Sequence, residues 1–280
     1  MVIIQSYLTN TKYYKRDRSI KVQGLLLHSV GVPQPNPKVF IKSWNREDLS
    51  GVCVHGFIGE EEAHITLPIF DTPGIAKHAP HGASGPNGSV NDTHIGIEMC
   101  EPSQIKYIKG ATFTCSDIPA ARAFVEKTTK NAVELFAKLC LFHNLDPLKD
   151  GVIISHAEGY KRGIASGHGD PEHLWDQLGM NYNMNKFRRD VYKAMQNGKM
   201  EDSPMNKELE EFKALFREMR KELQDNDGND WSKEARDWAM KTGIIQGTSS
   251  KNFNGAWEDF VTREQLVTLL YRLAKLLGEA

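Results

Sequence analysis

Apolar residues along the chain fall into short runs and longer periodic segments. Short runs rich in Val, Ile and Leu have the length of buried strands, and they cover residues 22–27, 52–58, 63–69, 94–100 and 151–154. Residues 119–143 repeat their apolar positions at helical spacing, and residues 183–197 form a second helix candidate. Because strands alternate with helices, the pattern predicts an α/β sheet domain.

Two segments between these elements are rich in Gly and polar residues. Residues 72–92 combine Gly, Pro, His and Asn, and residues 157–170 are again rich in Gly. The first segment predicts a long loop. Loops of that length are uncommon in compact domains unless they serve a function.

The character of the chain changes near residue 200. Ser203-Pro204 is typical of a helix start, and the apolar residues of 204–223 then lie on one face of a helix. A polar turn at 225–230 opens the last segment. We therefore expect a first, larger domain at 1–199, a linker helix within 200–226 and a small all-α module at 227–280.

Composition and charge exclude several functions. The 280 residues are 40% hydrophobic and 25% charged, as in ordinary soluble proteins. Residues 1–199 hold 23 Lys and Arg against 20 Asp and Glu, and the remainder holds 12 against 16. A balance of +3 and −4 is too weak to indicate nucleic-acid binding. No apolar run approaches the roughly 20 residues of a membrane helix, so we expect no membrane insertion.

The termini and cysteines suggest where the protein is made. The first apolar stretch is too short for a signal peptide. The four cysteines show no CxxC pairing, which predicts buried free thiols in a protein made in a reducing cytosol. We therefore expect synthesis in a reducing cytoplasm, followed by release if the target lies outside the membrane.

Three ionisable positions adjoin predicted strands. His28 follows a Leu run, Glu98 lies inside residues 95–98, and the interval from His156 to Asp170 follows the strand at 151–154. Two imidazoles and one carboxylate with an open position make a catalytic zinc site. The chain has ten histidines, which offer many such triples, so spacing alone leaves a structural role open for each residue.

Short motifs around these positions resemble one enzyme family. Residues 26–31 (LLHSVG), 95–98 (IGIE), 155–156 (SH) and 167–171 (GHGDP) occur in the order used by the zinc N-acetylmuramoyl-L-alanine amidases (amidase type 2). This family includes phage endolysins, bacterial autolysins and peptidoglycan recognition proteins. The resemblance covers roughly residues 20–195 and implies a mixed central sheet flanked by helices. Residues 77–79 (KHA) resemble the family's Trp-His-Ala segment, with Lys in place of Trp.

The resemblance implies a Zn²⁺ ion bound by His28, His156 and Asp170. The interval from His156 to Asp170 is longer than in many relatives, so the loop between them must bulge. His168 is therefore an alternative third ligand, with Asp170 as its hydrogen-bonded partner. The Pro and the aromatic residue that follow Asp170 match the family pattern, which favours Asp170 as the ligand.

The implied reaction is hydrolysis of the amide between N-acetylmuramic acid and L-alanine in peptidoglycan. Zinc lowers the pKa of bound water to about 7, and Glu98 would accept its proton and pass it to the leaving amine. Protonated His168 would help to stabilise the oxyanion. An alternative for Glu98 is a strand carboxylate bonded to neighbouring amides. His78 is a substrate-groove candidate or a solvated loop residue, and for His81 the solvated reading is favoured.

The last segment resembles one S-layer homology (SLH) repeat. It has a helix at 231–239, the sequence GIIQG at 243–247, and a helix led by Thr262-Arg263-Glu264. The resemblance implies binding to a secondary cell-wall polymer, with Arg263 paired to an anionic group. SLH modules usually contain three repeats, and a lone repeat needs neighbours to bury its face. Assembly of two or three chains and a simple stabilising appendage therefore both stay open.

The leading hypothesis is a peptidoglycan hydrolase of the phage endolysin type that causes host cell lysis. A host autolysin without a signal peptide fits the same residues. One alternative is a non-catalytic peptidoglycan-binding protein, although the full set His28, His156, Asp170 and Glu98 argues against a lost metal ligand. Another is a zinc peptidase that cuts within the stem peptide.

Overall fold

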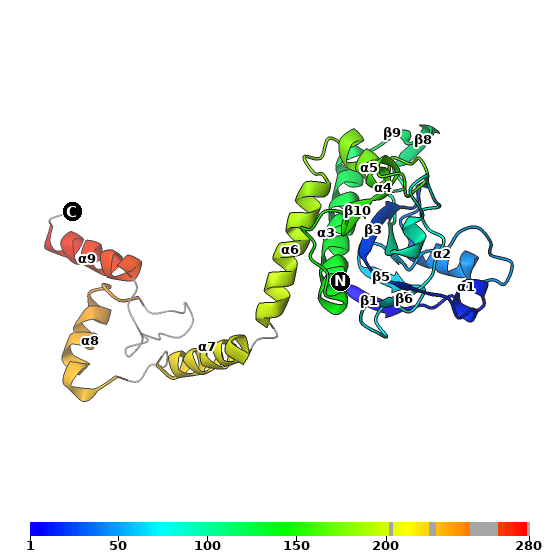
Figure 1. Cartoon of the computed structure of the whole chain (residues 1–280). Helices are drawn as coiled ribbons and strands as arrows, with labels where there is room; N and C mark the ends of the chain where they lie inside the picture. The colour runs from blue at the N-terminus through cyan, green and yellow to red at the C-terminus, as the bar shows by residue number, and fades with distance from the viewer. Residues whose placement is uncertain (202–203, 224–227, 247–262, 279–280) are drawn as a thin grey trace. The chain divides into compact units, whose positions relative to one another are not determined.

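The computed structural model describes residues 1–201, 204–223, 228–246 and 263–278 of the chain (Figure 1). It divides into two compact units, Met1–Lys199 and Met200–Ala280. The first unit contains every described strand, and the described part of the second is helical. The two units are considered separately below.

A six-stranded sheet forms the centre of the first unit. In spatial order its strands are β1 (Val2–Gln5), β5 (Glu62–Ile65), β4 (Gly56–Ile58), β7 (His94–Met99), β3 (Gly24–Ser29) and β10 (Ile153–Ser155). Four of the pairs are parallel, and only β4 with β5 is antiparallel. The sheet is therefore mixed, and the predicted fold class is confirmed.

The two faces of this sheet have different roles. Side chains alternate along a strand, so Leu25 and Leu27 of β3 point to one face while Leu26 and His28 point to the other. Leu25 and Leu27 belong to the main hydrophobic core, whereas Leu26 packs in a small separate cluster with Val90. One face is thus buried under helices, and the opposite face is available for polar residues.

The helix α3 (Ile118–His143) covers the core face, and its extent confirms the prediction for 119–143. Asp117 caps its start by accepting a hydrogen bond from the Ala120 amide. Asn144 ends it in the left-handed conformation, with φ 55°. The helix α6 (Met184–Glu201) lies beside α3, and its Phe187 ring meets Phe136 edge-on at 5.2 Å (Figure 1).

Shorter helices complete the unit. The helix α2 (Pro37–Trp44) begins at the N-cap Asn36, and its Phe40 stacks on Phe57 of β4 with ring centroids 4.8 Å apart. The other short helices are α1 (Lys12–Lys15), the 3₁₀ helix η1 (Val90–Asp92), α4 (His156–Lys161) and α5 (Glu172–Gln177).

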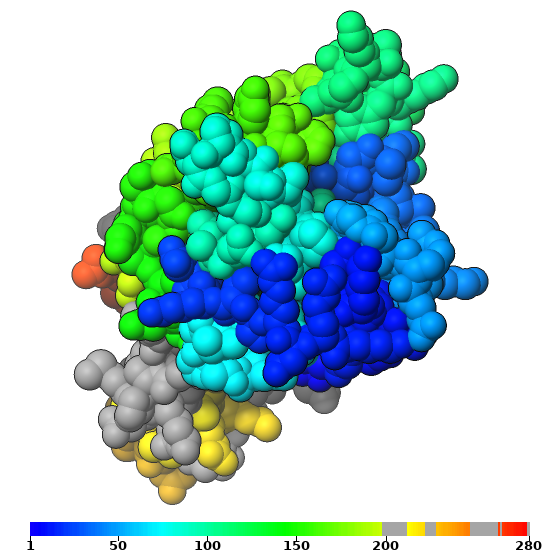
Figure 2. Space-filling model, turned by 45° about the vertical axis from the view of Figure 1, so that its right-hand side comes forward, coloured from blue at the N-terminus to red at the C-terminus, as the bar shows by residue number. Residues whose placement is uncertain are grey.

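Two small antiparallel pairs lie outside the main sheet. β2 (Ser19–Lys21) pairs with β6 (Ile75–Lys77), and β8 (Ile105–Lys109) pairs with β9 (Thr112–Cys115). The β8–β9 hairpin projects from the surface, where Ile108 is 67% exposed (Figure 2).

Several segments differ from the sequence prediction. The expected loop at 72–92 contains β6 and η1, and the Gly-rich stretch 157–170 begins inside α4. β6 forms by pairing with a strand more than 50 residues away, which a local pattern does not reveal. The strand expected at 52–58 is reduced to β4.

The described part of the second unit contains α7 (Pro204–Leu223), the 3₁₀ helix η2 (Asp230–Ser232), α8 (Lys233–Lys241) and α9 (Arg263–Leu277). Arg272 of α9 donates a hydrogen bond to the carbonyl of Ile244, which is buried just after α8. Ser203 and Thr262, which stand at the expected helix starts, and Gly247 of the SLH-like sequence lie outside the described residues.

Two general expectations are compatible with the described structure. All four cysteines are free thiols, and Cys53, Cys100 and Cys140 are buried. Across the described ranges, every helix is too short or too polar to cross a bilayer.

Asn131 of α3 offers a test of how this helix is attached to the sheet. Its buried amide donates to the carbonyls of Gly59 and Glu60 at 2.9 and 2.7 Å, in the turn between β4 and β5. Because Asn131→Ala leaves both carbonyls without this donor, we expect it to lower the free energy of unfolding by about 1–3 kcal/mol. Urea titration measures the change. Lys138→Ala, on the exposed face of the same helix, should stay within about 0.5 kcal/mol of the parent.

Candidate metal centre and active site

His28 and Glu98 lie side by side on the face of the sheet opposite α3. β3 and β7 run parallel, and their register sets His28 beside Glu98. Neighbours in register share a face, so both side chains emerge together. His28 lies inside β3, rather than after a strand as the sequence suggested, and it is 1% exposed. The backbone of the sheet therefore fixes the separation of these two residues.

His156 reaches the same face from the next strand. β10 pairs with β3, and His156 is the first residue of α4. Ser155 caps this helix by accepting from the Glu158 amide, while the Glu158 side chain accepts from the Ser155 amide. This capping box stops the strand and turns the chain at His156. The His156 ring then meets the His28 ring edge-on, with centroids 4.7 Å apart.

Asp170 completes a group of three. Its Oδ2 lies 3.3 Å from His28 Nδ1, and its Oδ1 lies 3.5 Å from His156 Nδ1. The two Nδ1 atoms are 3.1 Å apart. The amide of Ser29 donates to Asp170 Oδ2 at 3.3 Å, which holds the carboxylate against β3.

These distances fit a tetrahedral metal ion. Zinc binds His nitrogen and carboxylate oxygen at about 2.0–2.2 Å, which places tetrahedral ligand atoms roughly 3.3 Å from one another. The two Nδ1 atoms are 3.1 Å apart, and each is 3.3 or 3.5 Å from its own nearest oxygen of the Asp170 carboxylate. Two imidazoles and a carboxylate are also a donor set that suits zinc. The residues present therefore fit the group that the sequence implied.

The charges of the group favour the same interpretation. Burial lowers the pKa of His28, so its ring is neutral at pH 7 and keeps a free lone pair. Burial alone would raise the pKa of Asp170, but the adjacent imidazoles of His156 and His28 outweigh it and lower that pKa well below its usual range. Asp170 is thus ionised and has the negative charge that a cation requires.

Glu98 is a half-buried residue, and one oxygen of its carboxyl group is buried without a partner. Its Oε2 atom is inaccessible to solvent and accepts no hydrogen bond. Burial raises the pKa of Glu98 well above its ordinary value, and the nearby Asp170 and Glu101 add to the shift. Unpaired buried groups with shifted pKa values are concentrated at functional sites. The sequence also allowed Glu98 to be a strand carboxylate bonded to neighbouring amides. Because Oε2 accepts no hydrogen bond, that alternative does not apply to this atom.

A second acidic group, which the sequence did not single out, lies just beyond Glu98. Glu101 is fully buried; its Oε1 accepts from the Gly31 amide at 2.9 Å, and its Oε2 accepts from the Tyr107 hydroxyl at 2.7 Å. The Tyr107 oxygen also lies 2.7 Å from His173 Nε2. Glu101 therefore connects the loop after β3 to the β8–β9 hairpin. The one signal in the sequence was an acidic residue three positions after Glu98.

His168 lies outside the group of three. It is exposed, and its Nδ1 is 3.2 Å from His156 Nε2, on the side of that ring away from Asp170. Ser166 Oγ lies 3.2 Å from the same His156 nitrogen. The geometry therefore supports Asp170 as the third donor and leaves His168 beside the site.

His78 and His81 are both buried, so neither is the solvated loop residue that the sequence left open for His78 and favoured for His81. His78 lies 3.4 Å from Asp92 Oδ1, and its amide donates to the Arg18 carbonyl. The hydrogen bonds and ion pairs of the described residues do not link His78 to the group of three. His81, in contrast, touches it directly, with Nδ1 at 3.1 Å from His28 Nε2.

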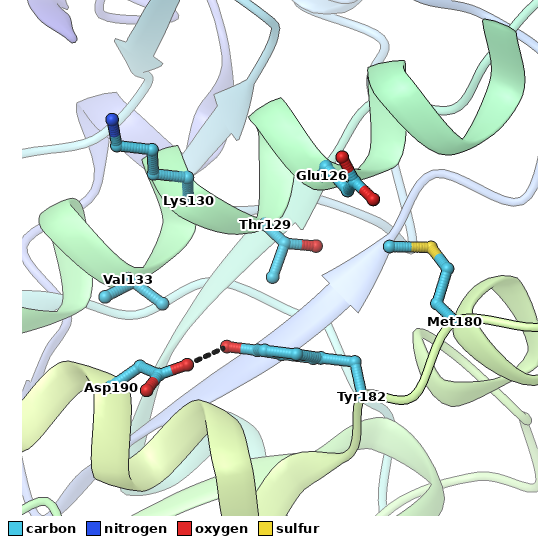
Figure 3. Close-up of a pocket in the computed structure, with 7 residues that line it drawn as sticks. All are labelled: Glu126, Thr129, Lys130, Val133, Met180, Tyr182 and Asp190. Atoms are coloured by element: carbon cyan, nitrogen blue, oxygen red, sulfur yellow. Dashed lines mark hydrogen bonds between the residues drawn. The ribbon is translucent and has the colours of Figure 1, made fainter. Parts of the chain in front are cut away.

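The remaining predicted residue and a separate cavity lie elsewhere. Arg263 is exposed at the first position of α9 in the second unit. In the first unit a cavity of about 290 Å³ lies between α3 and the segment leading into α6 (Figure 3). Its lining residues are Glu126, Thr129, Lys130, Val133, Met180, Tyr182 and Asp190, none of which is a predicted site residue.

Comparison of the sequence with protein families shows which family the chain matches. Residues 18–173, more than half of the chain, match the sequence profile of the N-acetylmuramoyl-L-alanine amidase family. The chain belongs to this family. The matched region of the amidase includes His28, Glu98, His156 and Asp170, so the group of three and the unpaired carboxyl lie inside it.

Solved structures of similar fold include amidases and endolysins. The catalytic domain of XlyA matches with a TM-score of 0.48 and 18% identity over 68% of this chain and 99% of that one. A mutant endolysin from Bacillus subtilis matches with a TM-score of 0.45 and 20% identity, over 68% of this chain and 99% of that one. The Staphylococcus aureus hydrolase AmiA matches with a TM-score of 0.48 and 14% identity, over 70% of this chain and 83% of that one. A search of curated proteins found no match.

The buried Glu101 of the amidase domain predicts a pH effect on stability. Burial raises its pKa to about 7, from an ordinary value near 4.5. A raised carboxyl pKa contributes stability that is fully present below pH 4.5 and is lost as the pH rises to about 7. Relative to Glu101→Gln, the parent should therefore lose on the order of 2–3 kcal/mol of unfolding free energy between pH 4.5 and pH 7.5.

Urea titration of both proteins across this pH range measures the difference. Glu61→Gln is the matched control, because the Glu61 side chain is 85% exposed and its pH dependence should follow the parent. Parallel curves for the parent and Glu101→Gln would contradict the assignment.

Proposed function

We propose that this family member hydrolyses the amide bond between N-acetylmuramic acid and L-alanine in peptidoglycan, with zinc as its cofactor. The observation that supports this most is the convergence of His28 Nδ1, His156 Nδ1 and Asp170 beside the buried, unpaired Oε2 atom of Glu98. A zinc ion held by these three residues would activate water at neutral pH and polarise the scissile carbonyl.

Glu98 takes the role of proton carrier in this proposal. Its register beside His28 keeps the carboxyl next to the metal ligands. The raised pKa reflects burial without a compensating cation, and a divalent ion nearby favours the ionised form. Glu98 then accepts a proton from the attacking water and delivers it to the amine of L-alanine as the amide breaks.

His168 and His78 take supporting roles. His168 is exposed next to His156, so when protonated it can donate to the oxygen that gains charge as the amide is attacked. Its position also leaves the third ligand site to Asp170. We assign His78 to a more distant part of the substrate groove, because its contacts are with Arg18 and Asp92.

Two other functions make different predictions for one experiment. Digestion of dye-labelled walls releases soluble dye if the protein is a hydrolase and releases none if it only binds peptidoglycan. Labelling of the new amino termini then separates the hydrolases. The amidase exposes L-alanine alone, whereas a peptidase acting within the stem peptide exposes other residues.

Glu98→Gln tests the proton carrier. The substitution keeps the size of the side chain and all three metal ligands, so we expect zinc content to remain near the parent's. Wall hydrolysis should fall by about 10²–10⁴-fold, since Gln accepts no proton. Metal analysis and dye release measure the two effects. The exposed Glu61→Gln should behave like the parent in both, and a fully active Glu98→Gln would remove Glu98 from the mechanism.

We further propose that the second unit attaches the enzyme to a secondary cell-wall polymer. Two described helices, α8 and α9, match the helical parts of the SLH-like sequence, and Arg263 is exposed at the start of α9. α9 also exposes several large apolar residues, among them Leu266, Val267, Leu270 and Tyr271. Such a face supports pairing between copies of this module. An enzyme made in the cytoplasm and attached in this way would act at lysis as an endolysin.

Arg263→Glu tests this attachment. In the Glu98→Gln background, which leaves walls intact, we expect the charge reversal to weaken sedimentation with purified walls by about tenfold or more, because an anionic polymer would be repelled. Lys275→Glu makes the same charge change near the other end of α9 and should retain binding. Equal binding by all three proteins would contradict a role for Arg263.

A further inference from the structure

The ring of His81 lies between His28, a member of the group of three, and the backbone of β7. Its Nδ1 lies 3.1 Å from His28 Nε2, and its Nε2 lies 2.9 Å from the carbonyl oxygen of His94. The ring is 8% exposed and meets the His28 ring edge-on at 5.3 Å. Both ring nitrogens of His81 are therefore in hydrogen-bonding contacts.

These contacts determine which nitrogen of each ring carries a proton. A carbonyl oxygen only accepts, so His81 Nε2 must be the protonated nitrogen. A neutral imidazole carries one ring proton, which leaves Nδ1 of His81 as an acceptor. The proton between the two rings then belongs to His28 Nε2. His28 Nδ1 consequently keeps its lone pair, and this is the atom that faces His156 and Asp170.

The surrounding chain is arranged to hold His81 in this position. Asn91 Oδ1 accepts from the amides of His81 and Gly82 at 2.9 and 2.8 Å, and Asn91 Nδ2 donates to the Ala83 carbonyl. A side chain at Gly96 would meet the His81 ring, since an added Cβ would lie 2.3 Å from its Cγ and Nδ1. The glycine of the IGIE sequence thus makes space for this imidazole.

We propose that His81 is a positioning residue that fixes the tautomer and orientation of His28 for metal binding. The inference rests on the proposed metal site and adds a residue that never touches the metal. Partners that hold a ligand imidazole in this way typically change metal affinity by 10- to 100-fold when they are removed. His81→Leu removes the atom that accepts from His28 Nε2. In His81→Asn the side-chain Oδ1 takes a place near that of Nδ1, so an acceptor remains.

The test measures zinc affinity of the full-length chain by competition with a chelator. We expect His81→Leu to bind zinc about 10- to 100-fold more weakly than the parent, and His81→Asn to recover part of that loss. Gly96→Ala displaces the His81 ring without altering any hydrogen-bonding group, so it should also weaken zinc binding. Nitrogen-15 NMR of the zinc-loaded parent should show a protected proton on His28 Nε2, and this protection should be lost in His81→Leu.

His143→Leu is the matched control. His143 is also buried and bonded through both ring nitrogens, to the Ile69 carbonyl and the Gly74 amide, but it lies away from the metal group. It should lower the melting temperature and leave zinc affinity at the parental value. Parental affinity in His81→Leu, or equal protection of the His28 Nε2 proton in the parent and in His81→Leu, would overturn the role of His81. A proton on His28 Nδ1 in the zinc-loaded parent would instead contradict metal binding through that atom. If the parent itself binds no zinc, the proposed metal site fails instead. If His81→Leu does not fold, the NMR result and Gly96→Ala still decide.

Discussion

The convergence of three electron-pair donors is the constraint on which this structure depends. His28 Nδ1 and His156 Nδ1 lie 3.1 Å apart, and each lies 3.3–3.5 Å from a different oxygen of the Asp170 carboxylate. Such atoms repel unless a proton or a cation lies between them. Their separations equal those of tetrahedral zinc ligands, and the ionised Asp170 supplies the negative charge. The surrounding residues keep these donors together.

The fold meets this constraint with parallel strands and two different sheet faces. β10, β3 and β7 are neighbours, so His156, His28 and Glu98 reach one face from three adjacent strands or strand ends. The opposite face is sealed by α3 and anchors the strands in the core. The buried ring of His81 contacts His28, and a second buried imidazole packs against His81 in turn. These rings support the donors from the side away from Asp170.

The sequence predicted the parts of this arrangement that depend on local pattern. The apolar runs that become β3, β7 and β10, and the periodicity of α3, arise from burial on sheet faces and beneath them, so they are visible in the residues themselves. The motifs then singled out His28, His156 and Asp170, which the fold brings together, and Glu98, which lies beside His28. β6 was missed because its partner strand is distant in the chain. His81 and Glu101 were missed because their importance comes from Asn91, Gly96 and Tyr107, which only folding brings to them.

One measurement tests the central claim directly. Crystals of the full-length protein grown with zinc can be analysed by anomalous scattering on both sides of the zinc absorption edge. The account predicts one strong peak about 2.0–2.2 Å from His28 Nδ1, His156 Nδ1 and an oxygen of Asp170, with Glu98 alongside. A peak bound instead by His168, by His28 Nε2, or at a site away from these residues would contradict it.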